Sequence, residues 1–145
     1  MKKTDKLARL ISSDIKDKKI LEVACGCADF SISASRYANS VSCIDIDDSR
    51  LSDNLPHNVI FEIMDASKMS YSNNSFEAVI LYNAFSHIYS QWDAIKDECM
   101  RVLKYSGALY IVSTWNLDIS LIVEVFGDNA KWEDDFLVVK FDKQF

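Results

Sequence analysis

The hydrophobic positions of the chain fall into short apolar runs, separated by segments in which apolar residues recur at helical spacing. The runs predict six strands: KILEVA (19–24), VSCIDI (41–46), NVIFEIM (58–64), FEAVILYN (76–83), ALYIVSTW (108–115) and FLVVKF (136–141). Continuous apolar runs of this length are typical of parallel strands that are buried on both faces.

The segments of helical spacing predict helices over 5–16, 29–38, 91–103 and 117–126. Thr4 or Asp5 is expected to cap the first helix, and 48–55 allows a short helix before Pro56. Ser106-Gly107 is expected to end the 91–103 helix, and Gly127 the last one. Strands that alternate with helices imply right-handed βαβ crossovers, so the sequence predicts an α/β, doubly wound, mostly parallel sheet of the Rossmann type.

The length, composition and net charge of the chain limit the kinds of protein it can be. The 145 residues suit a single domain over 1–145, and 49% of them are hydrophobic. The net charge of −6 disfavours contact with phosphate backbones, so nucleic acid is not expected as a partner. No apolar run approaches the roughly 20 residues of a membrane span, and the N-terminus lacks the pattern of a signal peptide. A cytoplasmic location is therefore expected.

The cysteines and histidines do not have the spacing of metal ligands. Cys25 and Cys27 form a C-x-C pair, but Cys43, Cys99 and the two histidines lie far from them in the sequence. In a cytoplasmic protein the four thiols are expected to be reduced. No metal site is predicted.

Polar residues stand where the first two predicted strands end, which is where open α/β sheets bind ligands. Glu22 lies within the first strand, and Gly26 lies in the turn that opens the next helix. A bare backbone at such a turn lets a ligand approach closely, and a helix N-terminus favours an anionic group. Asp45 ends the second strand about twenty residues later, where a carboxylate can accept hydrogen bonds from both hydroxyls of a ribose.

The third and fourth predicted strands also end in polar residues. Asp65 and Ala66 follow the third strand, and a carboxylate beside a backbone N–H can bind the edge of an adenine. Asn83 ends the fourth strand, where a loop can close over the polar end of a ligand. Each residue also has a purely structural interpretation. Glu22 can pair with a lysine, Gly26 can serve the turn alone, Asp45 can cap a following helix, Asp65 can cap a turn, and Asn83 can be an ordinary loop residue.

Together these segments resemble the class I S-adenosylmethionine-dependent methyltransferases, from about Lys18 to the C-terminus. The chain is most similar to the small-molecule enzymes of the ubiquinone-biosynthesis type. The resemblance rests on ILEVACGCADFS, IDIDDSRL, IMDASKMSYSNNSFEAVILYNAFSHI and MRVLKYSGALYIV. It implies a C-terminal antiparallel hairpin, here within about 129–141, and S-adenosylmethionine as the cofactor.

The resemblance also implies a role for individual residues. Glu22 would hold the methionine ammonium group through water, and Ala24, Cys25 and Gly26 would form the loop under the cofactor. Asp45 would bind the ribose diol and Ile46 would pack on the adenine face. Asp65 and Ala66 would contact the adenine edge, and Asn83 would lie near the methionine moiety. His87 would face the reacting centre, where it is the candidate general base, with Tyr82 second.

Three departures from the family pattern bear on function. Ala24 and Ala28 replace the outer two of three alternating glycines, and the Cβ of Ala28 is expected to crowd the cofactor or the helix. Tyr105-Ser106 replaces the usual Pro-Gly. The N-terminal substrate lid is reduced to about one helix, and a homodimer or a partner subunit would close so open a site.

The predicted function is methyl transfer to a small-molecule acceptor. The fourth strand ends in YNAF rather than Asn/Asp-Pro-Pro-aromatic, which argues against DNA bases as acceptors. One alternative is a catalytically degenerate domain of the same fold that acts as a scaffold or activating partner. A second is a nicotinamide dehydrogenase, in which Asp45 would also bind a ribose, although no G-x-G-x-x-G follows the first strand.

Overall fold

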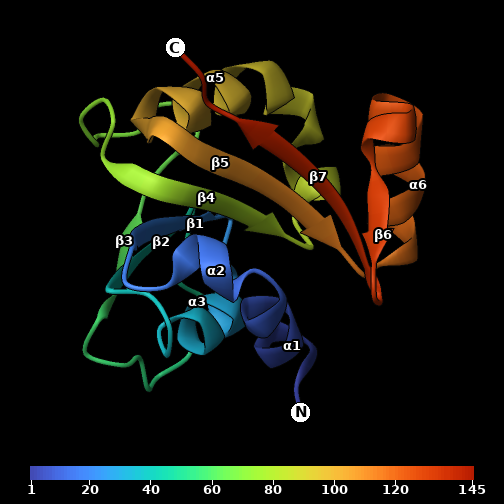
Figure 1. Ribbon diagram of the computed structural model, residues 1–145. Coiled ribbons are helices and arrows are strands. Elements are labelled where there is room, and N and C mark those ends of the chain that lie inside the picture. The colour runs from blue at the N-terminus through green and yellow to red at the C-terminus, as the bar shows by residue number, and fades with distance from the viewer.

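The computed structural model describes residues 1–145 and is built on a seven-stranded sheet in the order β3-β2-β1-β4-β5-β7-β6 (Figure 1). Strands β1 to β5 are parallel, whereas β7 runs antiparallel to both β5 and β6. This arrangement confirms the predicted Rossmann-like sheet with its antiparallel C-terminal pair. The strands are β1 (Lys19–Val23), β2 (Ser40–Asp45), β3 (Val59–Ile63), β4 (Phe76–Tyr82), β5 (Leu103–Ser113), β6 (Lys131–Glu133) and β7 (Phe136–Asp142).

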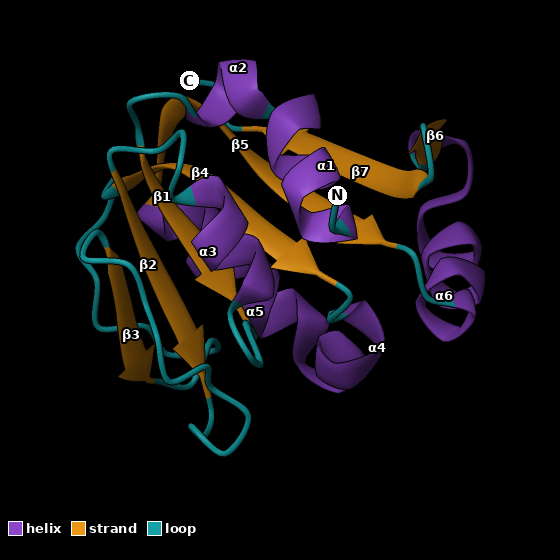
Figure 2. Cartoon of the chain, turned by 90° about the horizontal axis from the view of Figure 1, so that it is seen from below, coloured by secondary structure: helices purple, strands orange, loops and turns teal.

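Helices cover both faces of the sheet (Figure 2). The chain forms α1 (Lys3–Leu10), α2 (Ser12–Ile15), α3 (Asp29–Ala34), α4 (Phe85–Ile88), α5 (Trp92–Val102) and α6 (Asn116–Phe126), with 3₁₀ turns η1 (Tyr89–Gln91) and η2 (Gly127–Asn129). α1, α2 and α3 pack on one face, whereas α5 and α6 pack on the other. None of the helices combines the length and the apolar character that crossing a membrane requires.

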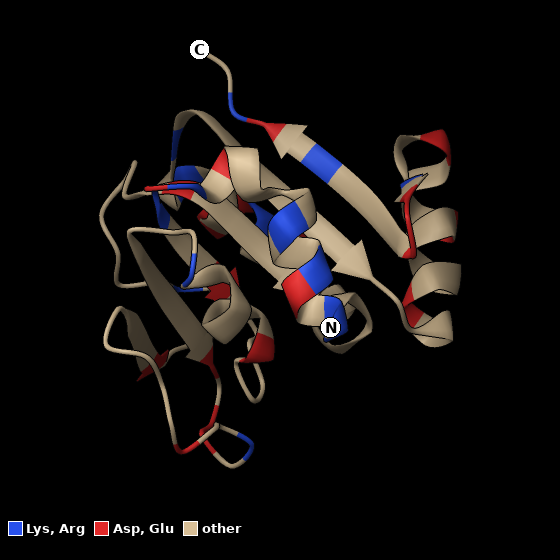
Figure 3. Cartoon of the chain, turned by 60° about the horizontal axis from the view of Figure 1, so that its bottom comes forward, with Lys and Arg blue, Asp and Glu red and all other residues tan.

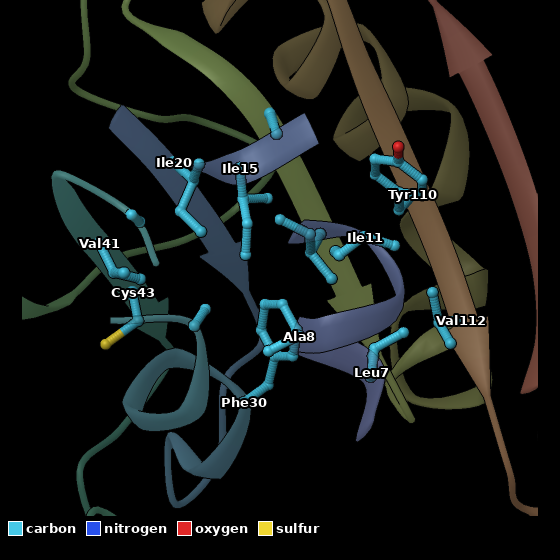
Figure 4. Close-up of a cluster of buried hydrophobic side chains, with 14 of the residues drawn as sticks. Leu7, Ala8, Ile11, Ile15, Ile20, Phe30, Val41, Cys43, Tyr110 and Val112 are labelled. Atoms are coloured by element: carbon cyan, nitrogen blue, oxygen red, sulfur yellow. The ribbon is translucent and has the colours of Figure 1, made fainter. Parts of the chain in front are cut away.

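Successive side chains of the central strands point to opposite faces of the sheet, so the molecule has two hydrophobic cores, one on each face. Ile20 of β1 points to the face of α1, α2 and α3, while its neighbour Leu21 points to the face of α5. Figure 4 shows the first core, in which Leu7, Ala8 and Ile15 belong to one cluster with Phe30 of α3. Burying each large apolar side chain contributes about 1.5–3 kcal/mol, so the two cores hold the strand ends in fixed positions.

The first predicted helix begins earlier and is broken. The chain forms α1 and α2 instead of one helix over 5–16, with Ile11 between them at φ −101° and ψ 15°. Neither Thr4 nor Asp5 caps α1, contrary to the prediction, because both lie inside it. The Ser33 hydroxyl lies 2.9 Å from the Thr4 hydroxyl and 2.6 Å from the Asp5 carboxylate, and these contacts tie α1 to α3.

Two helix predictions after β1 need correction. The helix predicted over 29–38 ends at Ala34, where the Ser35 hydroxyl donates to the Ile32 carbonyl at 2.6 Å and the chain turns. The short helix allowed over 48–55 is absent. Asp47 there accepts hydrogen bonds from the N–H and the hydroxyl of Ser49, and such local bonds compete with helix formation.

The region around Gly107 also differs from the prediction. α5 ends at Val102, and β5 begins at once with Leu103, so Gly107 lies inside a strand and does not end a helix. The pairing of β4 with β5 shifts between Phe76 and Ala78, opposite this glycine. The helix α4 was not predicted because four residues are too few to show a periodicity.

We predict that Gly107→Ala destabilises the protein by about 2–3 kcal/mol, through overpacking. A Cβ at Gly107 would lie 2.6 Å from the Glu77 carbonyl oxygen and 2.9 Å from Leu103 Cδ1. Gly127→Ala is the matched control. Its φ of +54° and ψ of −127° strain an alanine by about 1–3 kcal/mol, but no atom lies within 4 Å of the new Cβ, so it reports backbone strain without overpacking. Urea unfolding measures both variants, and a loss at Gly107 below about 1 kcal/mol would contradict the prediction.

Candidate functional site

A cavity of about 820 Å³ opens at the carboxyl ends of β1, β2 and β4. Its volume falls within the range of small-molecule sites. Ten residues singled out from the sequence all line it: Glu22, Ala24, Cys25, Gly26, Asp45, Ile46, Asp65, Ala66, Asn83 and His87. The parallel order of the strands brings them together, because the carboxyl ends of parallel strands meet at one edge.

The loop between β1 and α3 has left-handed backbone at every second residue. Ala24, Gly26 and Ala28 have φ of 56°, 57° and 67°. For an L-residue this conformation costs roughly 1–2 kcal/mol, so the two alanines carry strain that glycines would not. At Gly26 the guanidinium of the exposed Arg50 lies in the space that a Cβ would take, so a larger residue there would have to displace the end of that side chain. We call residues 24–28 the glycine loop.

Ala28 does not crowd the cavity, contrary to the expectation from sequence. Its side chain is fully buried in the core with α1 and α3 and is absent from the cavity wall. Its methyl group therefore packs against protein rather than against a ligand. The glycine loop keeps its shape, and the substitution leaves the cavity open.

Glu22 is a buried carboxyl group beneath the glycine loop, with only 2% of its surface exposed. One of its oxygens accepts hydrogen bonds from the N–H of Ser31 at 3.1 Å and from the Ser31 hydroxyl at 2.7 Å. No lysine pairs with it, so the interpretation of Glu22 as a strand acid paired with a lysine is wrong. Burial raises the pKa of Glu22 from 4.5 to about 8, against the opposing effect of the Ser31 hydrogen bonds.

Asp45, at the end of β2, joins two backbone segments of the cavity. Its Oδ2 accepts a hydrogen bond from the Gly26 N–H at 2.8 Å, and its Oδ1 accepts one from the Ile46 N–H at 2.7 Å. It caps no helix, because none follows β2. Each carboxylate oxygen has two lone pairs, so both can still accept from a ligand hydroxyl. Ile46 beside it is 75% exposed, which leaves an apolar side chain free to pack on a ligand.

Asp65 stabilises the turn in which it lies, and only one of its carboxylate oxygens takes part. Oδ1 accepts hydrogen bonds from the Ser67 N–H at 2.9 Å and from the Ser67 hydroxyl at 2.7 Å. These bonds hold the pKa of Asp65 below its ordinary value. Oδ2 has no protein partner, and the Ala66 N–H donates to no protein acceptor. An acceptor and a donor thus stand side by side at the cavity wall.

Asn83 uses most of its hydrogen-bonding capacity within the protein. Its Oδ1 accepts from the Ser113 hydroxyl at 2.9 Å and from the Thr114 N–H at 2.8 Å, and its Nδ2 lies 3.2 Å from the Thr114 hydroxyl. The residue lines the cavity, but these bonds tie the end of β4 to the end of β5. Its clearest structural effect is to fix the distance between those two strand ends.

His87 lies in α4 and is exposed at the rim of the cavity. Its ring meets the indole of Trp115 edge to face, with 6.0 Å between ring centroids and an angle of 85°. Tyr82, the second candidate base, also lines the cavity, and burial raises the pKa of its phenol. A phenol with a raised pKa holds its proton more tightly, so His87 is the better placed of the two to accept one.

Among the cavity-lining residues that sequence reasoning did not single out, Trp115 and Arg50 bear directly on the shape of the site. Trp115 follows the fifth strand and could have been found by the same rule of strand ends that identified Asp45. Arg50 gave no signal, because its approach to Gly26 depends on how the loop after β2 folds back. No group of three or more His, Cys, Asp or Glu side chains is placed to hold a metal ion.

Charged groups of both signs line the cavity. The acidic ones are Asp29, Asp45, Asp47 and Asp65, and the basic ones are Lys2, Lys3 and Arg50, while burial keeps Glu22 largely protonated at neutral pH. Figure 3 shows acidic segments along the loop at the end of β2, while basic segments lie on α1. At the strand ends, however, the acidic residues Glu22, Asp45 and Asp65 lie together. That part of the cavity suits a ligand with a cationic group, a ribose-like diol and a planar ring that the exposed Ile46 can cover.

Residues 21–111, which span β1 to β5, match the family model of the methyltransferase domain. The chain belongs to the methyltransferase domain family. This confirms the resemblance to class I S-adenosylmethionine-dependent methyltransferases. The matched segment contains the glycine loop and all ten predicted site residues. No curated protein sequence matches the chain.

The fold of this methyltransferase domain is similar to that of several solved structures. The N-methyltransferase NodS from Bradyrhizobium japonicum WM9 is 14% identical with a TM-score of 0.73, over 98% of this chain and 94% of that one. The PH0226 protein from Pyrococcus horikoshii OT3 is 25% identical with a TM-score of 0.67, over 95% and 72%. The chain spans only about half of several other matched structures, from 44% to 54% of five of them.

We predict that Glu22 makes the stability of the methyltransferase domain fall as pH rises from about 4.5 to 8. The folded state holds the Glu22 proton up to about pH 8, whereas the unfolded state releases it near pH 4.5. Stability that is present below pH 4.5 is therefore lost as pH approaches 8, with a slope on the order of 1 kcal/mol per pH unit.

Glu22→Gln isolates this effect, because the amide oxygen still accepts the Ser31 hydrogen bonds and no proton is released. Urea unfolding at several pH values should show the two proteins diverging above pH 5, with the variant the more stable. Parallel profiles would rule out a raised pKa at Glu22.

Proposed function

We propose that this domain binds S-adenosylmethionine in the cavity and transfers its methyl group to a small-molecule acceptor. The observation that carries the proposal is the meeting of the glycine loop, Asp45, Asp65 and His87 around one cavity of about 820 Å³. The donor set fits the cofactor: a carboxylate for a diol, an acceptor and donor pair for an adenine edge, and acidic groups for a cation.

The cofactor half of the site lies along the ends of β1, β2 and β3. Asp45 would accept the ribose hydroxyls while it keeps its bonds to Gly26 and Ile46. Ile46 would pack on the adenine face, and Asp65 with the Ala66 N–H would hold its edge. Bound S-adenosylmethionine supplies a methyl group on a positively charged sulfur, which is already activated toward a nucleophile.

Glu22 would respond to the positive charge of the cofactor. Its pKa of about 8 means that the carboxyl group is largely protonated at neutral pH before a ligand binds. A nearby ammonium or sulfonium group favours the ionised form and lowers that pKa. Binding is therefore coupled to release of a proton, and affinity for the cofactor should rise with pH through the neutral range.

The acceptor half of the site lies at the ends of β4 and β5. His87 would accept the proton that the acceptor loses when its nucleophilic atom attacks the methyl group. Because the sulfonium is already activated, the protein would contribute mainly by proximity and alignment, and the rings of His87 and Trp115, which meet edge to face, would provide the alignment. The acceptor would bind between this wall and the cofactor half.

We predict that Asp45→Ala weakens the binding of S-adenosylhomocysteine by about 1.5–3 kcal/mol, because charge-assisted hydrogen bonds are lost. Isothermal titration calorimetry measures the change. Asp48→Ala is the matched control: an exposed carboxylate of the same loop that does not line the cavity. Unchanged affinity in Asp45→Ala would remove Asp45 from the cofactor site. The absence of binding to the unmodified protein at millimolar ligand would contradict the proposed function itself.

We predict that His87→Ala lowers turnover by about 10²–10⁴-fold, the usual contribution of a general base, and leaves affinity for S-adenosylhomocysteine within twofold. Turnover is measured as S-adenosylhomocysteine release in the presence of a panel of small amines, phenols and carboxylic acids. His57→Ala, at the only other histidine, is the control and should keep full activity. Equal turnover in His87→Ala and His57→Ala would show that His87 has no part in proton transfer.

A further inference from the structure

A carboxylate outside the cavity lies behind the acceptor half of the site. Asp118 belongs to the first turn of α6 and has no exposed surface. An acidic residue at this position usually faces water, where it interacts with the helix dipole. A buried carboxylate is costly unless hydrogen bonds compensate for the lost water, so its partners indicate its role.

The first partner of Asp118 is the helix that carries His87. Asp118 Oδ1 accepts a hydrogen bond from the Ser86 N–H at 3.0 Å. Ser86 lies in the first turn of α4, where backbone N–H groups have no partner inside the helix. No side chain at the N-cap of α4 satisfies them, so Asp118 supplies the missing acceptor from a separate helix.

The second partner connects Asp118 to the backbone of Trp115. Asp118 Oδ2 lies 3.0 Å from the Ser113 hydroxyl, and that hydroxyl oxygen accepts a hydrogen bond from the Trp115 N–H at 3.1 Å. The Ser113 hydroxyl also lies 2.9 Å from Asn83 Oδ1, so its single hydrogen is shared between two acceptors. One buried network therefore fixes both segments that carry the exposed rings of His87 and Trp115.

We propose that Asp118 is the positioning residue of the acceptor half, which it serves by holding His87 and Trp115 in their edge-to-face contact. The proposal rests on the proposed function, because it concerns how His87 and Trp115 are held at the acceptor half of that same site. Asp118 does not line the cavity and touches no reacting atom. It acts through the backbone of Ser86 and through the Ser113 hydroxyl. A buried, well-satisfied network of this kind holds one geometry rather than several.

Proton NMR of the histidine Cε1–H signals tests the proposal without knowledge of the acceptor. The chain has two histidines, so the spectrum contains two such signals, and His57 serves as an internal reference. Trp115→Leu removes the ring current of the indole and calibrates the displacement of the His87 signal. Asp118→Ala should displace the His87 signal by at least half of that amount and leave His57 unmoved.

Conservative and control variants separate positioning from general destabilisation. In Asp118→Asn the amide oxygen can still accept from Ser86 and the amide nitrogen can donate to Ser113, so the His87 signal should stay close to its original position. Glu124→Ala, an exposed acidic residue of the same helix, should change nothing. Ser113→Ala removes the bond to Trp115 by a smaller truncation, and it should displace the His87 signal in the same direction if Asp118→Ala fails to fold.

An unmoved His87 signal in folded Asp118→Ala, or in Ser113→Ala where Asp118→Ala does not fold, would overturn the proposal. A displacement in Asp118→Asn as large as in Asp118→Ala would also overturn it. Titration of the same samples with S-adenosylhomocysteine keeps the two hypotheses apart. Asp118→Ala should bind the ligand within twofold of the unmodified protein. If the unmodified protein binds none, the proposed function fails whatever the NMR result.

Discussion

The hydrogen bond from the Gly26 N–H to Asp45 is the interaction on which the rest of the site depends. It joins the loop after β1 to the end of β2 across 2.8 Å. The loop needs such a restraint, because Ala24 and Ala28 adopt left-handed backbone that alanine otherwise avoids. The same carboxylate that restrains the loop is the one proposed to bind ribose, so the folding of the loop and the shape of the ligand site cannot be separated.

The electrostatics of the site follow from burial at the central strand. β1 is an internal strand of the sheet, paired with β2 and β4, and Glu22 within it is almost fully buried. A carboxyl group in that position keeps its proton at neutral pH, whereas hydrogen bonds from Ser67 hold the pKa of Asp65 below its ordinary value. The proposed site thus combines acidic groups at the strand ends with an inner acid that would ionise in response to a cation, an arrangement suited to a sulfonium cofactor.

The acceptor half is organised differently. It has few charged groups, and its wall is built from the short helix α4 and from the residues that follow β5. Both segments are too short to hold their geometry by backbone hydrogen bonds alone. Asn83, Ser113 and Asp118 supply the missing restraints as one buried network behind the wall. The residues proposed to bind the cofactor are therefore placed by strand ends, whereas those proposed to face the acceptor are placed by side-chain hydrogen bonds.

The sequence by itself determined the parallel sheet and the strand-end positions of Glu22, Asp45 and Asp65, because apolar runs and glycine turns are local signals. The family resemblance added His87. Only the tertiary structure decided that Ala28 faces the core, that 48–55 forms no helix, and that Asp118 is buried behind the wall. These features depend on contacts between residues far apart in the chain, such as Asp118 with Ser86, and no periodicity in the sequence encodes such contacts.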